Sequence, residues 1–127
     1  MTSGKQGIRP EGSFDAERLG FSQGVLVDGV LHVSGQVSRA SGLEAQVTDA
    51  WSSVVGVVEA AGGTAADIAK LTVYTRDEAA WTHLQPLVTA AMSPPYPAAT
   101  MVTVVGLASP EFLVEIEALA HLQSDAR

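Results

Sequence analysis

One carboxylate in an apolar run is the residue of this chain whose type and setting most suggest chemistry. Glu117 lies between Ile116 and Ala118, in the middle of a segment typical of a β-strand. A carboxylate there is costly unless it is hydrogen-bonded or takes part in a reaction, so Glu117 is a candidate general base or water-positioning group. The alternative is a structural ion pair or a rim contact between subunits, which for a single carboxylate is the commoner explanation.

Other chemically useful residues are few. Ser34 and Gly35 end a predicted strand and offer a hydroxyl and exposed backbone groups, although turns end strands in every protein. The three histidines, His32, His83 and His121, are far apart and lack the spacing of metal ligands. The chain has no cysteine, no Gly-rich phosphate loop and no Gly-x-Ser-x-Gly motif. We therefore expect no metal and no cofactor.

A hairpin and a long helix make up the first half of the predicted fold. Two apolar runs at residues 24–27 and 30–35 flank Asp28-Gly29, a dipeptide that favours the positive φ values of a tight hairpin turn. Apolar residues then recur at helical spacing from residue 44 to 61. Gly62-Gly63 supplies the helix stop.

A second helix follows in the other half. Thr64 and Asp67 form a capping-box pattern for a short helical turn that we expect to run through Lys70. Asp77 is expected to cap the second long helix, and Pro86 within it predicts irregular first turns. The remaining strands are expected at residues 71–75, 100–105 and 113–122.

The resulting order, β-β-α-β-α-β-β, predicts an α+β fold with two long helices on one face of a mixed sheet. We expect residues 1–20, rich in Gly and charge, to be a lead-in, and residues 21–127 to form a single domain.

The last strand predicts what lies on the other face of the sheet. Its side chains alternate in direction. One set is apolar and suits packing under the helices: Val114, Ile116, Ala118, Ala120 and Leu122. The other set mixes apolar and charged residues: Leu113, Glu115, Glu117, Leu119 and His121. This mixed face fits an intersubunit surface with polar pockets, or a sheet face that is half covered by water.

The composition restricts the classes of partner that the chain is expected to bind. The chain has 127 residues, 46% of them hydrophobic and 17% charged, with a net charge of -7. An acidic surface repels nucleic acid, and the seven basic residues form no stripe. The N-terminal residues contain no apolar stretch, so we expect no secretory leader, no membrane span and a cytoplasmic location.

Several short motifs follow one another between about Phe21 and Leu122. They are Phe21-Ser22-Gln23-Gly24, Val33-Ser34-Gly35-Gln36, Glu59-Ala60-Ala61-Gly62, Lys70-Leu71-Thr72-Val73-Tyr74, Tyr96-Pro97-Ala98-Ala99 and Val114-Glu115-Ile116-Glu117-Ala118. No single motif is specific without the others, but taken in this order they resemble the Rid family, also called RidA, YjgF or UK114.

The resemblance implies a chorismate-mutase-like subunit in a homotrimer, with the sheets forming a central β-barrel and a small-molecule cleft at each subunit interface. In family members that deaminate enamines and imines, an arginine grips the substrate carboxylate, a backbone amide at the Ser-Gly strand end assists, and a glutamate of the closing strand positions water. By position these are Ala99, Ser34-Gly35 and Glu117, with Phe21 as the aromatic at the entrance.

Alanine at the arginine position is the main departure from this pattern. A guanidinium–carboxylate pair contributes about 1.5–3 kcal/mol in a shielded pocket, and Ala99 cannot replace it. With Met101 nearby, the segment predicts a more apolar pocket and a less anionic ligand, while Arg76 is better explained as an exposed loop residue.

Three functions remain open. The first is a metabolite-binding protein or sensor without deaminase activity. The second is an enzyme in which Glu117 positions water on an imine or another hydrolysable compound. The third is an imine deaminase that holds its substrate by backbone groups alone. The ribonuclease activity attached to some relatives finds little support in this acidic surface.

Overall fold

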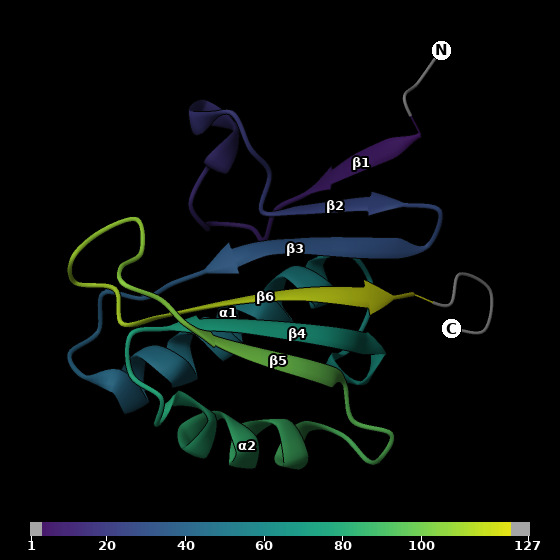
Figure 1. Cartoon of the computed structure of the whole chain (residues 1–127). Coiled ribbons are helices and arrows are strands. Elements are labelled where there is room, and N and C mark those ends of the chain that lie inside the picture. The colour runs from purple at the N-terminus through teal and green to yellow at the C-terminus, as the bar shows by residue number, and fades with distance from the viewer. Residues whose placement is uncertain (1–3, 123–127) are drawn as a thin grey trace.

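The computed structural model describes residues 4–122, so the first three residues of the expected lead-in and the last five of the expected domain lie outside it. Six strands, two long helices and two short 3-10 helices follow one another (Figure 1). Their bounds are β1 Lys5–Ile8, η1 Ala16–Leu19, β2 Gly24–Val27, β3 Val30–Gln36, α1 Leu43–Ala60, η2 Ala65–Asp67, β4 Ile68–Thr75, α2 Ala80–Ala91, β5 Ala98–Thr103 and β6 Val114–His121.

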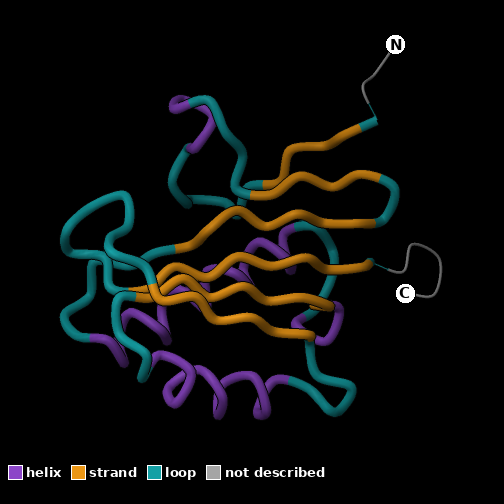
Figure 2. The backbone as a smooth tube through the Cα atoms, viewed as in Figure 1, coloured by secondary structure: helices purple, strands orange, loops and turns teal. Residues whose placement is uncertain are grey.

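The strands form one sheet in the order β1-β2-β3-β6-β4-β5. Among the strands of residues 4–122, only β4 and β5 run parallel to each other, and the other neighbouring pairs are antiparallel. Both long helices gather on one side of this sheet (Figure 2). The predicted α+β fold with a mixed sheet and two helices on one face is therefore confirmed.

The predicted hairpin joins β2 to β3. Asp28 has a φ of 51° and Gly29 a φ of 78°, the left-handed values that such a two-residue turn needs. Pairing is in register from Val27↔Val30 to Gly24↔Val33.

The core lies between the sheet and α1. Val47, Val54 and Val58 on α1 are fully buried, and so are Leu71 and Val73 on β4. On β6 the burial alternates as predicted: Val114, Ile116, Ala118 and Ala120 are buried, while Glu115, Glu117 and Leu119 on the opposite face are only partly covered. The strand thus separates an apolar layer from an uncovered sheet face.

Four local expectations need correction. Part of the expected lead-in belongs to the sheet, because Lys5–Ile8 pair with β2. The capping box of Thr64 and Asp67 is present, but the helical turn ends at Asp67 and does not reach Lys70. Ile68 is 3% exposed and pairs with Ala120, so burial and strand pairing override the helical signal.

The start of α2 also differs. The helix begins at Ala80, and its N-cap residue Ala79 makes no side-chain cap. The Asp77 carboxylate instead accepts a hydrogen bond of 2.9 Å from the Ala79 amide, in the turn before the helix. Strand β5 spans residues 98–103 and not 100–105. Among the described residues, no helix is long and apolar enough to span a membrane.

Candidate functional site

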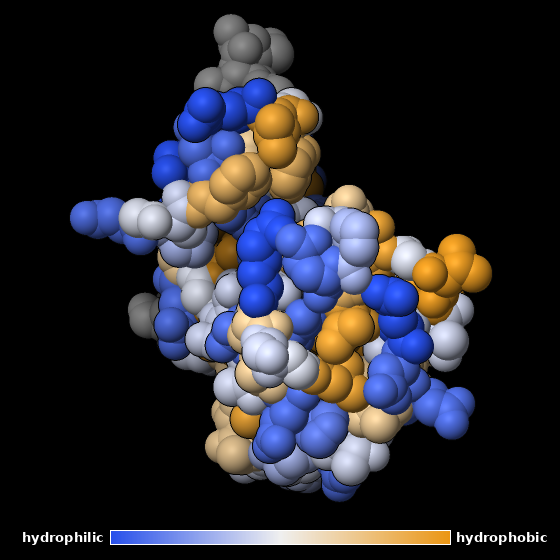
Figure 3. All heavy atoms as spheres, turned by 90° about the vertical axis from the view of Figure 1, so that its left-hand side faces the viewer, coloured by the Kyte–Doolittle hydropathy of each residue, from blue (hydrophilic) through white to orange (hydrophobic). Residues whose placement is uncertain are grey.

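Three parts of the chain meet at one end of the sheet, where β3 and β4 end and β6 begins: the segment before β2, the end of β3 with the loop after it, and the loop before β6 (Figure 1). They border an open cavity of about 400 Å³. Its lining residues are Phe14, Phe21, Gln23, Gly35, Gln36, Val37, Ser38, Arg39 and Phe112. Figure 3 looks at this end of the molecule, where apolar side chains surface between strongly hydrophilic ones. Two of the predicted site residues, Phe21 and Gly35, thus line one cavity.

A network of amides and one hydroxyl forms the floor of this cavity. Gln23 is 8% exposed and donates to the Phe14 carbonyl at 2.8 Å. Gln36 donates to the Gln23 side-chain oxygen at 3.1 Å. The Ser34 hydroxyl donates to the Gln23 backbone carbonyl at 3.1 Å, so it ties β3 to the segment before β2. Ser34 is not among the residues that line the cavity, and it supports the floor from beneath.

Gly35 lies at a bulge where the ladder between β3 and β6 shifts register. A Cβ added to Gly35 would come 1.8 Å from the Glu115 carboxylate oxygen. Only glycine lets this carboxylate lie against the backbone of β3, so the glycine and Glu115 form one feature.

Glu115 does not line the cavity, but its carboxylate lies against Gly35, which does. Burial raises its pKa, and the neighbouring charge of Glu117 raises it further. A carboxyl group with a raised pKa, next to a cavity, is a recognised mark of a functional site.

Glu117 is held differently. The Tyr74 hydroxyl donates a hydrogen bond to its carboxylate, across the uncovered face of β4 and β6. This bond is the main reason that the pKa of Tyr74 is raised. The predicted catalytic candidate therefore has a partner within the described chain, and Glu117 does not line the cavity of Phe21 and Gly35.

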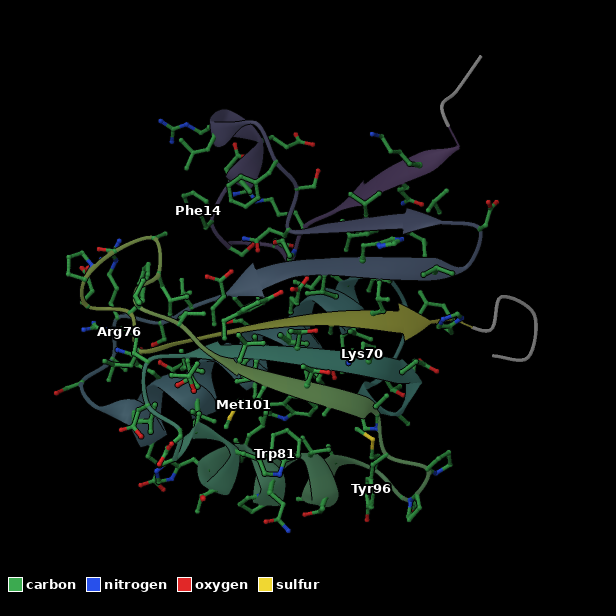
Figure 4. The ribbon with its side chains drawn as sticks, in the orientation of Figure 1. Phe14, Lys70, Arg76, Trp81, Tyr96 and Met101 are labelled. Carbon is green, nitrogen blue, oxygen red and sulfur yellow. The ribbon has the colours of Figure 1, made fainter. Side chains whose placement is uncertain are left out.

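Ala99 and Met101 lie at the far side of the sheet. Strand β5 is the edge strand, separated from β3 by β6 and β4. Its register pairs Ala99 with Leu71 and Met101 with Val73, so these two side chains are on the face toward the helices, the opposite face from Glu117. Figure 4 labels Met101 on β5, and Phe14 at the other end of the sheet order. One chain does not bring all the predicted site residues together.

An arginine that the sequence did not single out lies in the cavity. The Arg39 guanidinium lies 4.8 Å from the centroid of the Phe112 ring and forms an ion pair with Glu111. No local pattern marks this residue, because its loop meets Phe112 only through the tertiary fold.

A buried glutamine holds these two loops together. Gln46 of α1 is 2% exposed, and its amide donates to the carbonyls of Ala40 at 3.0 Å and Glu111 at 2.9 Å. Its oxygen accepts from the Leu113 amide at 2.8 Å. A signal for this residue existed in the sequence, since Gln46 is a polar residue inside the apolar stripe of α1.

The other titratable candidates do not converge. The exposed Arg76 donates to the Pro110 carbonyl at 2.9 Å, as expected of a loop residue. Within residues 4–122, no three His, Asp or Glu side chains are grouped so that they could hold a metal ion.

These features define a class: a single-sheet α+β protein with an uncovered sheet face and a loop-lined cavity at the end of β3. A profile of the family described as endoribonuclease L-PSP matches residues 14–122. The chain belongs to this family, and the resemblance to Rid proteins is confirmed.

Solved structures of similar proteins agree with this family assignment. A protein of unknown function from Pseudomonas aeruginosa is 31% identical over 94% of this chain and 93% of that one, with a TM-score of 0.84. A member of the YjgF/YER057c/UK114 family from Mycobacterium tuberculosis is 28% identical, covering 93% and 99%, with a TM-score of 0.80. RidA from an Antarctic Psychrobacter is also 28% identical, covering 92% and 99%, with a TM-score of 0.77.

Proposed function

We propose that this chain is a Rid-type protein that binds a small metabolite in pockets shared between subunits, and that it is not a deaminase of 2-aminoacrylate-like imines. The observation that carries the proposal is the cavity at the end of β3, which is lined by Phe21 and Gly35 at the positions where Rid proteins hold their ligands. Ala99 stands where the deaminating members have the arginine that grips the substrate carboxylate.

The sheet order supports a pocket built from two chains. Strands β3 and β5 are three positions apart, which at about 4.8 Å per strand is roughly 14 Å. In addition, Ala99 and Met101 face the helix side of the sheet, opposite to Glu117. These residues form one site only when β5 of one chain meets β3 of the next. A homotrimer whose uncovered sheet faces close into a central β-barrel would bring β5 of one chain to β3 of the next. We place this trimer in the cytoplasm, without nucleic acid or membrane partners.

The test measures binding and turnover separately. Purified protein should melt at a higher temperature in the presence of a bound metabolite, and this ligand should be recovered unchanged. It should not accelerate hydrolysis of 2-iminopropionate generated in situ. Ala99→Arg should introduce or raise that activity. Rapid hydrolysis by the unmodified protein would overturn the proposal.

A second candidate function is favoured by Glu115. A half-buried carboxyl group against Gly35, with its pKa raised by burial, suits a group that positions water on an imine or another hydrolysable compound. Glu117 remains the alternative carboxylate for this role. The substitutions Glu115→Gln and Glu117→Gln distinguish the two carboxylates. Only the substitution of the residue that positions water should abolish turnover while ligand binding persists.

A further inference from the structure

The cavity contains a cation that the family pattern does not account for. Arg39 lies at its mouth, 4.8 Å from the Phe112 ring centroid and paired with Glu111. The two charged side chains are 67% and 47% exposed. An ion pair this exposed is weak and exchanges readily, so another carboxylate can take the place of Glu111.

The position of Arg39 is fixed from beneath. Gln46 binds the carbonyl of Ala40, next to Arg39, and the carbonyl of Glu111, next to Phe112. One buried side chain therefore sets the distance between the cation-bearing loop and the aromatic loop. These bonds hold the backbone on either side of the Arg39–Phe112 contact, while the guanidinium itself stays exposed at the mouth of the cavity.

Aromatic rings form the rest of the mouth. Phe14 and Phe21 have their ring centroids 6.4 Å apart and are 58% and 46% exposed. Phe112 is 6% exposed and lies under the Arg39 guanidinium, so Phe14 and Phe21 offer the open ring surface beside a floor of glutamine amides. Such a cavity takes a flat apolar body that stacks on the rings.

We propose that Arg39 is the anion anchor of this cavity, that the ligand is a flat, aryl-type carboxylate, and that Glu111 occupies the guanidinium while the cavity is empty. This inference rests on the proposed function, whose pocket it uses. It replaces the expectation of a less anionic ligand, because the cation missing at position 99 is supplied from the loop after β3.

The Glu111 carboxylate can leave Arg39 and still keep a hydrogen-bond donor. The Ser109 hydroxyl donates to its carboxylate and is the main reason that the pKa of Glu111 is lowered. When a ligand takes Arg39, Glu111 keeps this hydrogen bond and its contact with water. The exchange leaves no buried charge without a partner.

Two probes of the same size test the inference. Benzoate and benzamide differ in charge but hardly in shape, and each is titrated into the full-length protein while the amide resonance of Gly35 is followed by NMR. Benzoate should bind more tightly than benzamide. Arg39→Ala should weaken benzoate about tenfold and leave benzamide unchanged. Glu111→Gln should tighten benzoate about threefold, because the internal competitor is gone.

Arg18→Ala is the matched control. It removes the same charge from an exposed residue of η1 that does not line this cavity, so benzoate affinity should not change. Equal binding of both probes, or an Arg39→Ala effect on benzamide as large as on benzoate, overturns the role of Arg39 while leaving the pocket. No shift of Gly35 with either probe overturns the proposed function, and the inference with it.

Discussion

At the scale of single residues, the two carboxylates of β6 share a face but not an environment. The Glu117 carboxylate accepts a hydrogen bond from the Tyr74 hydroxyl, whereas the Glu115 carboxylate lies against Gly35, which has no side chain to donate one. The charge of Glu117 contributes to the raised pKa of Glu115, so the protonation of Glu115 is coupled to that neighbouring charge.

This coupling predicts the result of one substitution. Glu117→Gln removes the neighbouring charge, so the pKa of Glu115 should fall but stay above its ordinary value, because burial is the larger cause and remains. A pH titration of the Glu115 carboxyl carbon by NMR measures this. A pKa unchanged by the substitution would contradict the coupling, and Glu44→Gln, on the exposed start of α1, is the control.

The raised pKa also predicts a pH dependence of stability. The folded state binds the Glu115 proton more tightly than the unfolded state, so the stability contributed by this group is present at low pH. It is lost as the pH rises from the ordinary glutamate pKa of 4.5 through the higher pKa of the folded state. Glu115→Gln, which mimics the protonated form, should therefore gain stability relative to the unmodified protein over this window. Urea unfolding at a series of pH values checks this, and a constant difference would contradict it.

At the scale of elements, α1 does more than cover the sheet. Through Gln46 it fixes the loop after β3 and the loop before β6, the two segments that carry Arg39 and Phe112. The Gln46 side chain is 2% exposed and its three hydrogen bonds are partly buried, so water can replace them only in part.

Gln46→Met keeps the side-chain volume but removes these hydrogen bonds. It should lower the free energy of unfolding by about 2–3 kcal/mol, since backbone groups on both loops lose their partner. Gln85→Met, at an exposed position of α2, should change it by less than about 0.5 kcal/mol. Equal effects of the two substitutions on the free energy of unfolding in urea would show that the hydrogen bonds of Gln46 do not stabilise the two loops.

The elements were predictable where the signal is local. Asp28-Gly29 fixes its hairpin through the φ values of two residues, and the alternation along β6 predicts its two faces. Strand β1 was missed because only Ile8 of its four residues is buried, so its sequence lacks an apolar pattern. It forms because β2 offers a free edge.

The candidate site was predictable only in part, for the same reason. Phe21 and Gly35 follow from motif order, but Arg39 meets Phe112 through a contact 73 positions apart in the chain. Glu115 was placed on the correct face by alternation. Its closeness to Gly35 depends on a bulge that the sequence does not show.

At the scale of the whole molecule, the edge strand β5 is left uncovered. All six of its residues are exposed, including Met101 at 37% and Val102 at 39%. An exposed apolar edge strand tends to pair with another chain.

This edge predicts how assembly can be broken. Light scattering of the unmodified protein should give about three times the chain mass of 13.1 kDa. Val102→Lys should give a smaller species, because it puts a charge into the contact, without loss of secondary structure. Val105→Lys changes a fully exposed loop residue and should leave the assembly intact. A chain that is monomeric before any substitution would contradict the shared pocket.

The separation of Phe21 from Met101 across the sheet order has a genetic consequence. A protein whose pocket is divided between chains should show complementation between two defective alleles. One allele carries a damaged Phe21 and the other a damaged Met101, and neither supports function alone. In cells expressing both, mixed assemblies pair the intact half of one chain with the intact half of the next, so part of the lost function returns.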